Sequence, residues 1–309
     1  MKSRAAHFEL VGGLGNQLFI YAASRYLSER LKIQTATFWG QKKRGDTTHL
    51  SSLTSFDLPG PRPKGNGLVL RVSLKVRQGI RRGLKLAGVD SDLAERIANL
   101  HTPKGLGQDI GLHKVKPGWI VTGYFQTSEY YQWLREYTQE FPLQLRNPSS
   151  WYLDMERQII EESPTVIHVR RGDYLLDSNK QIGALSEQYY LSGLLATLEK
   201  DSNRKRPIWI FTDDPIRVKA EFAQLTSFNI RWVDAPKNSD PAESLLLMSK
   251  GEAIVISNST FSWWAAALGQ HRKVVAPSEW FRHMPEPEGL LLSQWTRAPS
   301  TWLEGSVEV

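Results

Sequence analysis

Two arginines and several acids follow short apolar runs in the second half of the chain, where they could bind a phosphorylated ligand. Arg170 and Arg171 directly follow the run at 165–169, and Asp213 comes just after the next such run. Guanidinium groups pair with phosphate oxygens through two parallel hydrogen bonds. A carboxylate such as Asp213 or Asp234 could accept a hydrogen bond from a guanine amino group or a ribose hydroxyl. These residue types are consistent with a nucleotide-diphosphate site.

A polar run opens a helical pattern further along the chain. Ser257-Asn258-Ser259-Thr260-Phe261 follows the apolar run at 253–256 and leads into the helical pattern at about 260–270. Backbone N–H groups and the positive end of the helix dipole attract anions at a helix N-terminus. Because the carboxyl ends of parallel strands meet at one edge of a sheet, we expect this run to lie beside the arginines.

Each of these features also has a purely structural interpretation. Residues 258–260 could cap the helix that follows, Asp213 or Asp214 could begin a helix at Pro215, and the arginine pair could be solvated. Their combination at one sheet edge favours a ligand. The adjacent acids are poor partners for one cation because neighbouring side chains at a strand end point to opposite faces. The arginines could neutralise a diphosphate instead, so we expect no metal and no cofactor.

A glycine loop near the N-terminus is a second candidate site. Gly12-Gly13-Leu14-Gly15 precedes Asn16 and Gln17, which open a helical pattern. The loop fits only part of the dinucleotide-binding pattern, because Leu18 stands where the third glycine is needed and no acid ends the next expected strand. A nicotinamide oxidoreductase is therefore not indicated. The loop would instead present the Asn16 and Gln17 amides toward a cleft between domains.

Alternating strands and helices must position these residues. Continuous apolar runs separated by helical patterns of 10–15 residues are typical of parallel βαβ units. The second half has expected strands at 165–169, 208–211, 229–233, 253–256 and 273–276. The first half has expected strands at 7–11, 33–38 and 119–122, with helices at 16–32 and near 128–139. We predict an α/β protein with an N-terminal domain at 1–150, a linker near 147–164 and a C-terminal domain at 160–309.

A basic insertion at about 57–118 interrupts the predicted N-terminal, acceptor-side domain. The chain has 309 residues, no cysteine and a formal net charge of +7, and residues 58–89 hold eight lysines and arginines without an acid. Such a cluster indicates an anionic surface nearby. Val72, Val76 and Ile80 recur at helical spacing, which favours an amphipathic helix on an anionic membrane or a packed helix with a solvated basic face. A nucleic-acid role is disfavoured because the segment lacks aromatic residues and a recognition motif.

Four motifs together resemble glycosyltransferase family 11. They are GGLGNQLF at 12–19, HVRRGDY at 168–174, FTDD at 211–214 and SNSTFSWW at 257–264, and they occur in order over most of the chain. The alanines at 265–267 depart from the family pattern, where we expect glycine or tryptophan in many relatives. The resemblance implies inverting α-1,2-fucosyltransferases that use GDP-L-fucose, and a GT-B fold of two Rossmann-like domains facing across a cleft. Residues 57–118 carry no family motif.

The same resemblance implies roles for individual residues. Arg170 would hold the diphosphate, with Asp173, His168 and Arg171 shaping that site. The donor site would be completed by Asp213, Asp234, Asn258, Ser259, Thr260 and Phe261, and the acceptor side would comprise Gly15, Asn16 and Gln17. The acceptor would be a galactose-terminated oligosaccharide or lipid-linked glycan of an O-antigen or capsule. We expect a cytoplasmic protein, with peripheral contact to the inner face of the cytoplasmic membrane through residues 58–89.

The expected reaction is attack of an acceptor hydroxyl on C1 of β-linked fucose, from the face opposite GDP, to give an α-fucoside. Charge that develops on the departing diphosphate would be stabilised mainly by Arg170. Asn16 could orient the hydroxyl, and its proton could leave through water, Asp173 or the phosphate itself. Another nucleotide-sugar donor on the same scaffold is the main alternative.

Overall fold

The computed structural model describes residues 5–40, 52–58, 67–137, 143–198, 206–223, 225 and 228–304. The chain divides into two compact units. Unit 1 comprises Met1–Gln144 and Pro287–Leu290, and unit 2 comprises Leu145–Glu286 and Leu291–Val309. Each unit has a parallel β-sheet with helices packed on it, so the predicted α/β class is confirmed. The facing arrangement of the two units stays a prediction.

Unit 1 is built on a sheet of four described strands in the order β2-β1-β4-β3, all parallel. The strands are β1 (Ala6–Leu10), β2 (Thr35–Trp39), β3 (Leu100–His101) and β4 (Ile120–Val121). Helix α1 (Leu14–Leu31) packs on β1 and β2, and α4 (Ser128–Tyr137) packs on α1. The short 3₁₀ turns η1 (Ser52–Ser55) and η2 (Ile110–Lys114) complete the unit.

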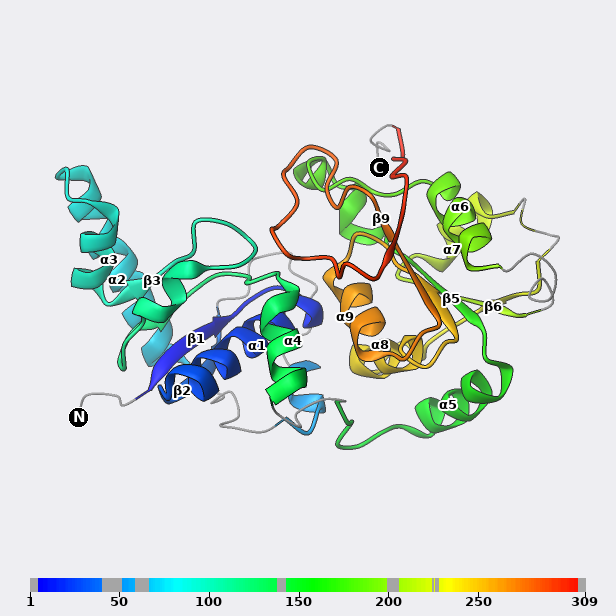
Figure 1. The fold of residues 1–309 in the computed structure, drawn as a ribbon, viewed down its shortest axis with the longest axis horizontal. Helices are drawn as coiled ribbons and strands as arrows, with labels where there is room; N and C mark the ends of the chain where they lie inside the picture. The colour runs from blue at the N-terminus through cyan, green and yellow to red at the C-terminus, as the bar shows by residue number, and fades with distance from the viewer. Residues whose placement is uncertain are drawn as a thin grey trace. The chain divides into compact units, whose positions relative to one another are not determined.

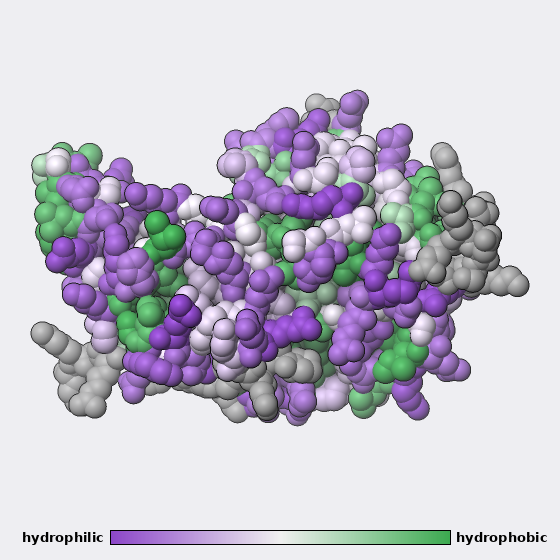
Figure 2. Space-filling model, viewed as in Figure 1, coloured by the Kyte–Doolittle hydropathy of each residue, from purple (hydrophilic) through white to green (hydrophobic). Residues whose placement is uncertain are grey.

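The described part of the basic segment forms α2 (Leu68–Leu86), which pairs with the following helix α3 (Ser91–Ala98) at the β3 edge of this sheet. The two helices pack against each other and on β3 (Figure 1). The predicted amphipathic helix is therefore present, although part of residues 58–66 lies outside the described residues. Strand β3 belongs to the sheet, so the span 57–118 is not merely an insertion. In the space-filling view, apolar side chains gather on the outer surface of this helical pair (Figure 2).

Unit 2 has six described parallel strands in the order β10-β9-β8-β5-β6-β7. They are β5 (Thr165–Val169), β6 (Ile208–Thr212), β7 (Ile230–Trp232), β8 (Ala253–Val255), β9 (Lys273–Pro277) and β10 (Thr296–Ala298). From β5 the chain proceeds through β6 and β7 on one side and later through β8, β9 and β10 on the other. The carboxyl ends of β5 and β8 therefore mark a topological switch point, where open α/β sheets bind ligands.

Five helices of unit 2 accompany this sheet in the described residues. They are α5 (Ser150–Glu162), α6 (Glu187–Thr197), α7 (Pro215–Glu221), α8 (Pro241–Met248) and α9 (Thr260–Leu268). Short 3₁₀ turns η3 (Gly172–Leu175) and η4 (Asp177–Asn179) follow β5. The main core lies between β5, β6, β8 and β9 and helices α6 and α7, with Ile167, Ile210 and Val255 at its centre.

The predicted linker at 147–164 is wrong, because α5 occupies most of it. Ser149 caps this helix by accepting from the Tyr152 N–H at 3.1 Å. The same serine donates from its backbone N–H and hydroxyl to Glu243 of α8, at 2.7 and 3.0 Å. Helix α5 is thus fastened to unit 2. Within the described part of the chain, no helix is both long and apolar enough to cross a bilayer.

Candidate functional site

Arg170 lies directly beyond β5 at the switch point, between two carboxylates. Its Nη2 donates to Asp173 Oδ1 at 2.6 Å, and its Nη1 lies 2.8 Å from Asp213 Oδ2. The guanidinium also sits 5.5 Å from the ring centre of Tyr174. Burial lowers the pKa of Arg170, but the nearby carboxylates of Asp213 and Asp173 raise it by more. The net pKa lies above the ordinary value, so the group is cationic. The structure thus holds one charged fork in a fixed position at the sheet edge.

The Arg171 guanidinium does not reach this edge, which corrects its predicted contact with the donor. Its backbone N–H still shapes the site by donating to Asp213. Its side chain is fully buried and pairs with Glu221 of α7, from Nε at 2.8 Å and from Nη2 at 2.7 Å. Its Nη1 donates to the backbone carbonyls of Arg170 and Leu185. Adjacent side chains leaving a strand point in opposite directions. Arg171 therefore ties the loop to α7 and does not offer its guanidinium to a ligand.

The three acids after β6 and β7 have different roles. Asp213 Oδ1 accepts from the Arg171 N–H at 2.8 Å while Oδ2 faces Arg170, so both oxygens are already used. Each carboxylate oxygen can accept more than one hydrogen bond, so the predicted contact of Asp213 with the donor stays a prediction. Asp214 is the N-cap of α7 and accepts from the Arg217 N–H at 3.2 Å. Asp234 is exposed, 3.6 Å from Lys219 Nζ, and stays a predicted donor ligand.

Glycine is required immediately after the arginine pair. Gly172 has φ of +30°, and a Cβ there would lie 2.5 Å from Asp213 Oδ2. Any larger residue would therefore displace the carboxylate that positions Arg170.

The polar run after β8 combines a capping role with a partly open surface. Ser259 caps α9 by accepting from the Phe261 N–H at 3.3 Å. Asn258 is buried and donates from Nδ2 to the Gly183 carbonyl at 2.9 Å. Its Oδ1 has no partner among the described residues, and neither has Arg170 Nε. Thr260 and Phe261 are partly exposed at the helix start. Two buried polar atoms without partners at one sheet edge suit a site completed by a ligand.

His168 connects the two strands at the switch point. Its Nδ1 is 3.0 Å from Ser257 Oγ, and its ring lies 5.6 Å from that of Phe261. Burial and the nearby Arg170 lower the pKa of His168 to about 3. The imidazole is therefore neutral at physiological pH and braces the site, without a charge to offer a phosphate.

In unit 1, the glycine loop after β1 presents Asn16 at the start of α1. Asn16 is partly exposed, and its Oδ1 accepts from Gln126 Nε2 at 2.9 Å. Gly12 has φ of +72°, and a Cβ there would lie 2.6 Å from Asn16 Nδ2. Gln17 is buried and donates from Nε2 to the Gly12 carbonyl at 2.8 Å, while Gly15 is buried. Of the three predicted acceptor-side residues, Asn16 alone has a partly exposed side chain.

Comparison with known proteins identifies the family. A model of glycosyl transferase family 11 matches residues 120–296, more than half of the chain. The chain belongs to glycosyl transferase family 11. The resemblance drawn from the four motifs is thereby confirmed, and the protein is a glycosyltransferase.

This family 11 glycosyltransferase is similar in sequence to three curated relatives. The O-antigen biosynthesis glycosyltransferase WbnK of Escherichia coli is 27% identical over 290 residues, covering 88% of this chain and 93% of that protein. The alpha-1,2-colitosyltransferase of Escherichia coli is 27% identical over 143 residues, covering 44% and 46% respectively. Galactoside alpha-(1,2)-fucosyltransferase 1 of Mus musculus is 24% identical over 135 residues, covering 42% and 35%.

Three further polar residues of this family 11 protein were not predicted from the motifs. Tyr174 flanks Arg170 and donates from its hydroxyl to the Asn258 carbonyl at 3.1 Å, which links the two halves of the switch point. Gln126 holds Asn16 from 110 residues away. Glu9 lies in β1, its carboxylate close to Gly40, and burial raises its pKa. The tyrosine could have been found as part of the HVRRGDY motif, and the acid as a charged residue within an apolar strand.

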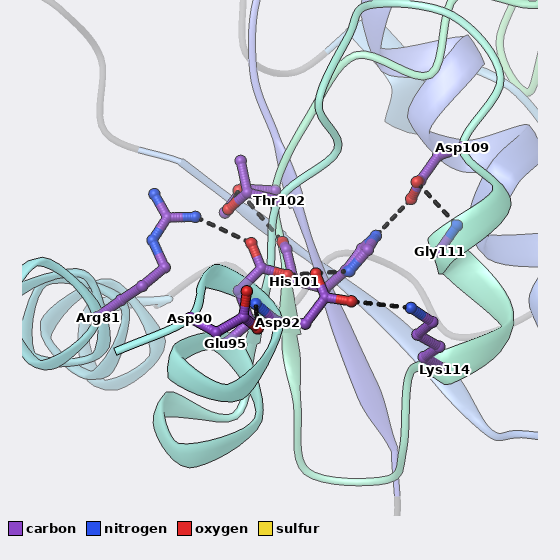
Figure 3. A network of polar contacts seen from close by, with 10 residues as sticks. Arg81, Asp90, Asp92, Glu95, His101, Thr102, Asp109, Gly111 and Lys114 are labelled. Carbon is purple, nitrogen blue, oxygen red and sulfur yellow. Dashed lines mark hydrogen bonds and ion pairs between the residues drawn. The ribbon is translucent and has the colours of Figure 1, made fainter. Parts of the chain in front are cut away.

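A second polar cluster of this glycosyltransferase lies in unit 1, beside α2 and α3 (Figure 3). His101, at the end of β3, contacts Asp109 through Nε2 and lies 3.5 Å from Glu95 of α3 through Nδ1. Glu95 in turn lies 3.2 Å from Arg81 of α2. Burial lowers the pKa of His101, but Asp109 and Glu95 raise it to about 9. A cavity of about 350 Å³ adjoins the cluster and is lined by Asp92, Glu95, Arg96, His101, Lys114, Lys116 and Trp119.

The described residues contain no group of three or more His, Cys, Asp or Glu side chains that could hold a metal ion. Metal-independent catalysis by the family 11 enzyme stays a prediction.

Proposed function

We propose that this protein transfers L-fucose from GDP-β-L-fucose, with inversion, to O-2 of a galactose terminus in an O-antigen or capsule repeat. Family membership and the two relatives named for α-1,2 transfer support the linkage, and WbnK supports the pathway. The observation that carries the proposal is Arg170, held between Asp173 and Asp213 at the switch point beside the N-terminus of α9. We place the reaction in the cytoplasm.

Arg170 is assigned to the diphosphate of the donor. A phosphate oxygen would compete with Asp173, which is half exposed and can move away, whereas Asp213 is fixed by the Arg171 N–H. The bound fork would then face the charge that develops on the leaving group. The N-terminus of α9 adds a partial positive charge next to it. Arg170 and the N-terminus of α9 would together stabilise the negative charge of the leaving group, and the proposal needs no metal ion for this.

The acceptor hydroxyl is assigned to the Asn16 side of unit 1. Gln126 fixes the Asn16 carbonyl oxygen, which leaves the Nδ2 group to orient a sugar hydroxyl. Asp173 is paired with the arginine that holds the leaving group, so it is badly placed to take a proton on the opposite face of the sugar. The leaving phosphate would lie on the same side as Asp173, so water remains as proton acceptor, with Glu9 as an additional carboxylate in unit 1 whose pKa burial raises.

A colitose-bearing nucleotide is the second candidate donor. It is favoured by the similarity to the alpha-1,2-colitosyltransferase, which is 27% identical over 143 residues, or 44% of this chain. Colitose and fucose donors would use the same diphosphate contacts, so Arg170 does not distinguish them.

The test is GDP release from GDP-L-fucose with and without a β-galactoside, in EDTA, for the wild type and Arg170→Ala. We expect acceptor-dependent release that falls about 10²–10³-fold in the variant, because one charged contact to the leaving group is lost. Arg157→Ala, which removes an exposed and ion-paired arginine of α5, is the matched control and should keep full activity. Near-normal turnover by Arg170→Ala would refute the assignment. If the enzyme turns over a colitose donor but not GDP-L-fucose, colitose is the sugar it transfers.

A further inference from the structure

Helix α2 carries an apolar stripe on its outer face in addition to Leu70 and Leu74, which pack on the core of unit 1. The outer stripe is exposed to solvent: Val69 is 79% exposed, Val76 56% and Val72 54%. Leu74 is its one buried residue. A surface helix normally faces its apolar stripe toward the core. The outward stripe therefore needs an explanation beyond the packing of unit 1.

Charged side chains hold the opposite face of α2 to the protein. Arg77 Nη1 donates to the carbonyls of Asn99 and Gly118, at 2.6 and 2.9 Å. Arg81 pairs with Glu95, which the His101 cluster holds in place. These bonds fix the rotation of the helix about its axis. The apolar stripe cannot turn inward without breaking them.

The exposed stripe is continuous and bordered by positive charge. At about 100° per residue, Leu68, Val69, Val72, Val76, Ile80 and Leu86 fall within one third of the helix circumference, together with Gly79 and Gly83. Arg71, Lys75 and Arg82 form a row along one side of the stripe, and the helix contains no acid. On α3, Leu93 and Ile97 are also about half exposed and lie one turn apart. Apolar side chains gather on the surface of the α2 and α3 pair (Figure 2).

We propose that this surface docks on an anionic phospholipid bilayer. A helix with an apolar face and a cationic border lies in the headgroup region, with its apolar side chains among the acyl chains and its cations at the phosphates. The row of cations selects an anionic surface over a neutral one. A neutral protein surface would leave that row without partners, so a bilayer accounts for both the stripe and its border. The contact would hold the enzyme where lipid-linked acceptors lie.

The two glycines in the stripe allow a test that does not disturb the fold. A Cβ added at Gly79 or Gly83 meets no atom within 4 Å, and any ordinary residue there favours the helix over glycine. The double variant Gly79→Glu/Gly83→Glu puts two negative charges into the stripe. Gly79→Ala/Gly83→Ala is its matched control, because it changes the same positions and keeps the surface apolar. Ile216→Glu, at an 87% exposed site on α7, controls for added charge elsewhere.

The experiment is flotation of the full chain with vesicles of phosphatidylcholine, alone or with one third phosphatidylglycerol. We expect binding that needs phosphatidylglycerol and weakens with salt as charges are screened. The alanine pair and Ile216→Glu should bind like the wild type. Each glutamate should lower the partition coefficient about fivefold, the effect of one charge at an anionic surface.

Three results would overturn the proposal. They are equal binding to both kinds of vesicle, unchanged binding by the glutamate pair, and no binding by the wild type. If the wild type forms a dimer in light scattering that the glutamate pair abolishes, and does not bind vesicles, the surface is an interface between two copies of the chain. Because lipid binding is read without catalysis, the result does not depend on the proposed fucosyl transfer.

Discussion

Replacing His101 by glutamine should flatten the dependence of folding stability on pH between about 7 and 10. In the native protein, Asp109 and Glu95 hold the imidazole in its charged form and raise its pKa to about 9, against the burial that lowers it. The ordinary value is 6.5. A raised pKa in the folded state means that the stabilisation is complete below pH 6.5 and is lost as pH rises through about 9.

The size of the effect follows from the difference between these pKa values. At 1.36 kcal/mol for each pKa unit, it corresponds to about 3 kcal/mol of unfolding free energy at low pH, declining toward zero above pH 9. Solvent screening takes little from this figure because the His101 side chain is only 7% exposed. The stability lost includes the anchoring of α3, because Glu95 is held by the same imidazole.

The measurement is urea unfolding of the wild type and His101→Gln at pH 6, 8 and 10, with the His101 ring followed by NMR. The two proteins should differ by about 3 kcal/mol at pH 6 and converge at pH 10. His283→Gln is the matched substitution of a histidine that lies in unit 2, outside this cluster. A wild-type titration midpoint near 6.5, or parallel stability curves for the two proteins, would refute the reasoning.

Three further predictions concern the site. Gly172→Ala should cost about 1–3 kcal/mol of stability and weaken GDP binding, because the added Cβ would meet Asp213 and displace this carboxylate from Arg170. Thermal melting measures the stability and calorimetry measures the GDP affinity. An unchanged GDP affinity would contradict the prediction. Asn16→Ala should lose transfer while GDP still binds, as checked by turnover beside calorimetry; equal loss of both would remove the positioning role. Arg171→Ala should lower stability by about 1.5–3 kcal/mol, because the Arg170 and Leu185 carbonyls lose a charged donor and Glu221 keeps only Arg217 among its described ion-pair partners; a melting temperature close to that of the wild type would argue against a structural role.

The strands of unit 2 could be located from sequence because parallel strands are buried on both faces. Thr165–Val169 is apolar enough to stand out, and every residue in it is buried. Strand β3 could not be found in the same way, since Leu100–His101 is too short for any periodicity. The segment at 147–164 was misinterpreted because its Asn-Pro-Ser-Ser start suggests a break, when the second serine is the cap of a helix.

The candidate site was predicted in position but not in detail. Motif order brings Arg170 and residues 257–261 to one edge, and the strand order of the sheet agrees. Which arginine of the pair faces outward depends on the alternation of side chains, whereas the motif alone predicts ligand contacts for both. The His101 cluster joins residues 95, 101 and 109 from a helix, a strand and a loop, so only the tertiary fold brings them together.

The short return of residues 287–290 to unit 1 bears on the order in which the protein is made. The Gly289 carbonyl accepts from the Ser128 N–H at 2.8 Å, at the first turn of α4, and from Thr127 Oγ1 at 3.3 Å. These donors emerge from the ribosome about 160 residues before their acceptor. During synthesis, water must therefore accept the hydrogen bonds of the Ser128 N–H and the Thr127 hydroxyl. This lasts until every described strand of the unit 2 sheet except β10 has been translated. The N-terminal unit is begun first and completed late, so a nascent chain halted before residue 287 would carry an unfinished α4.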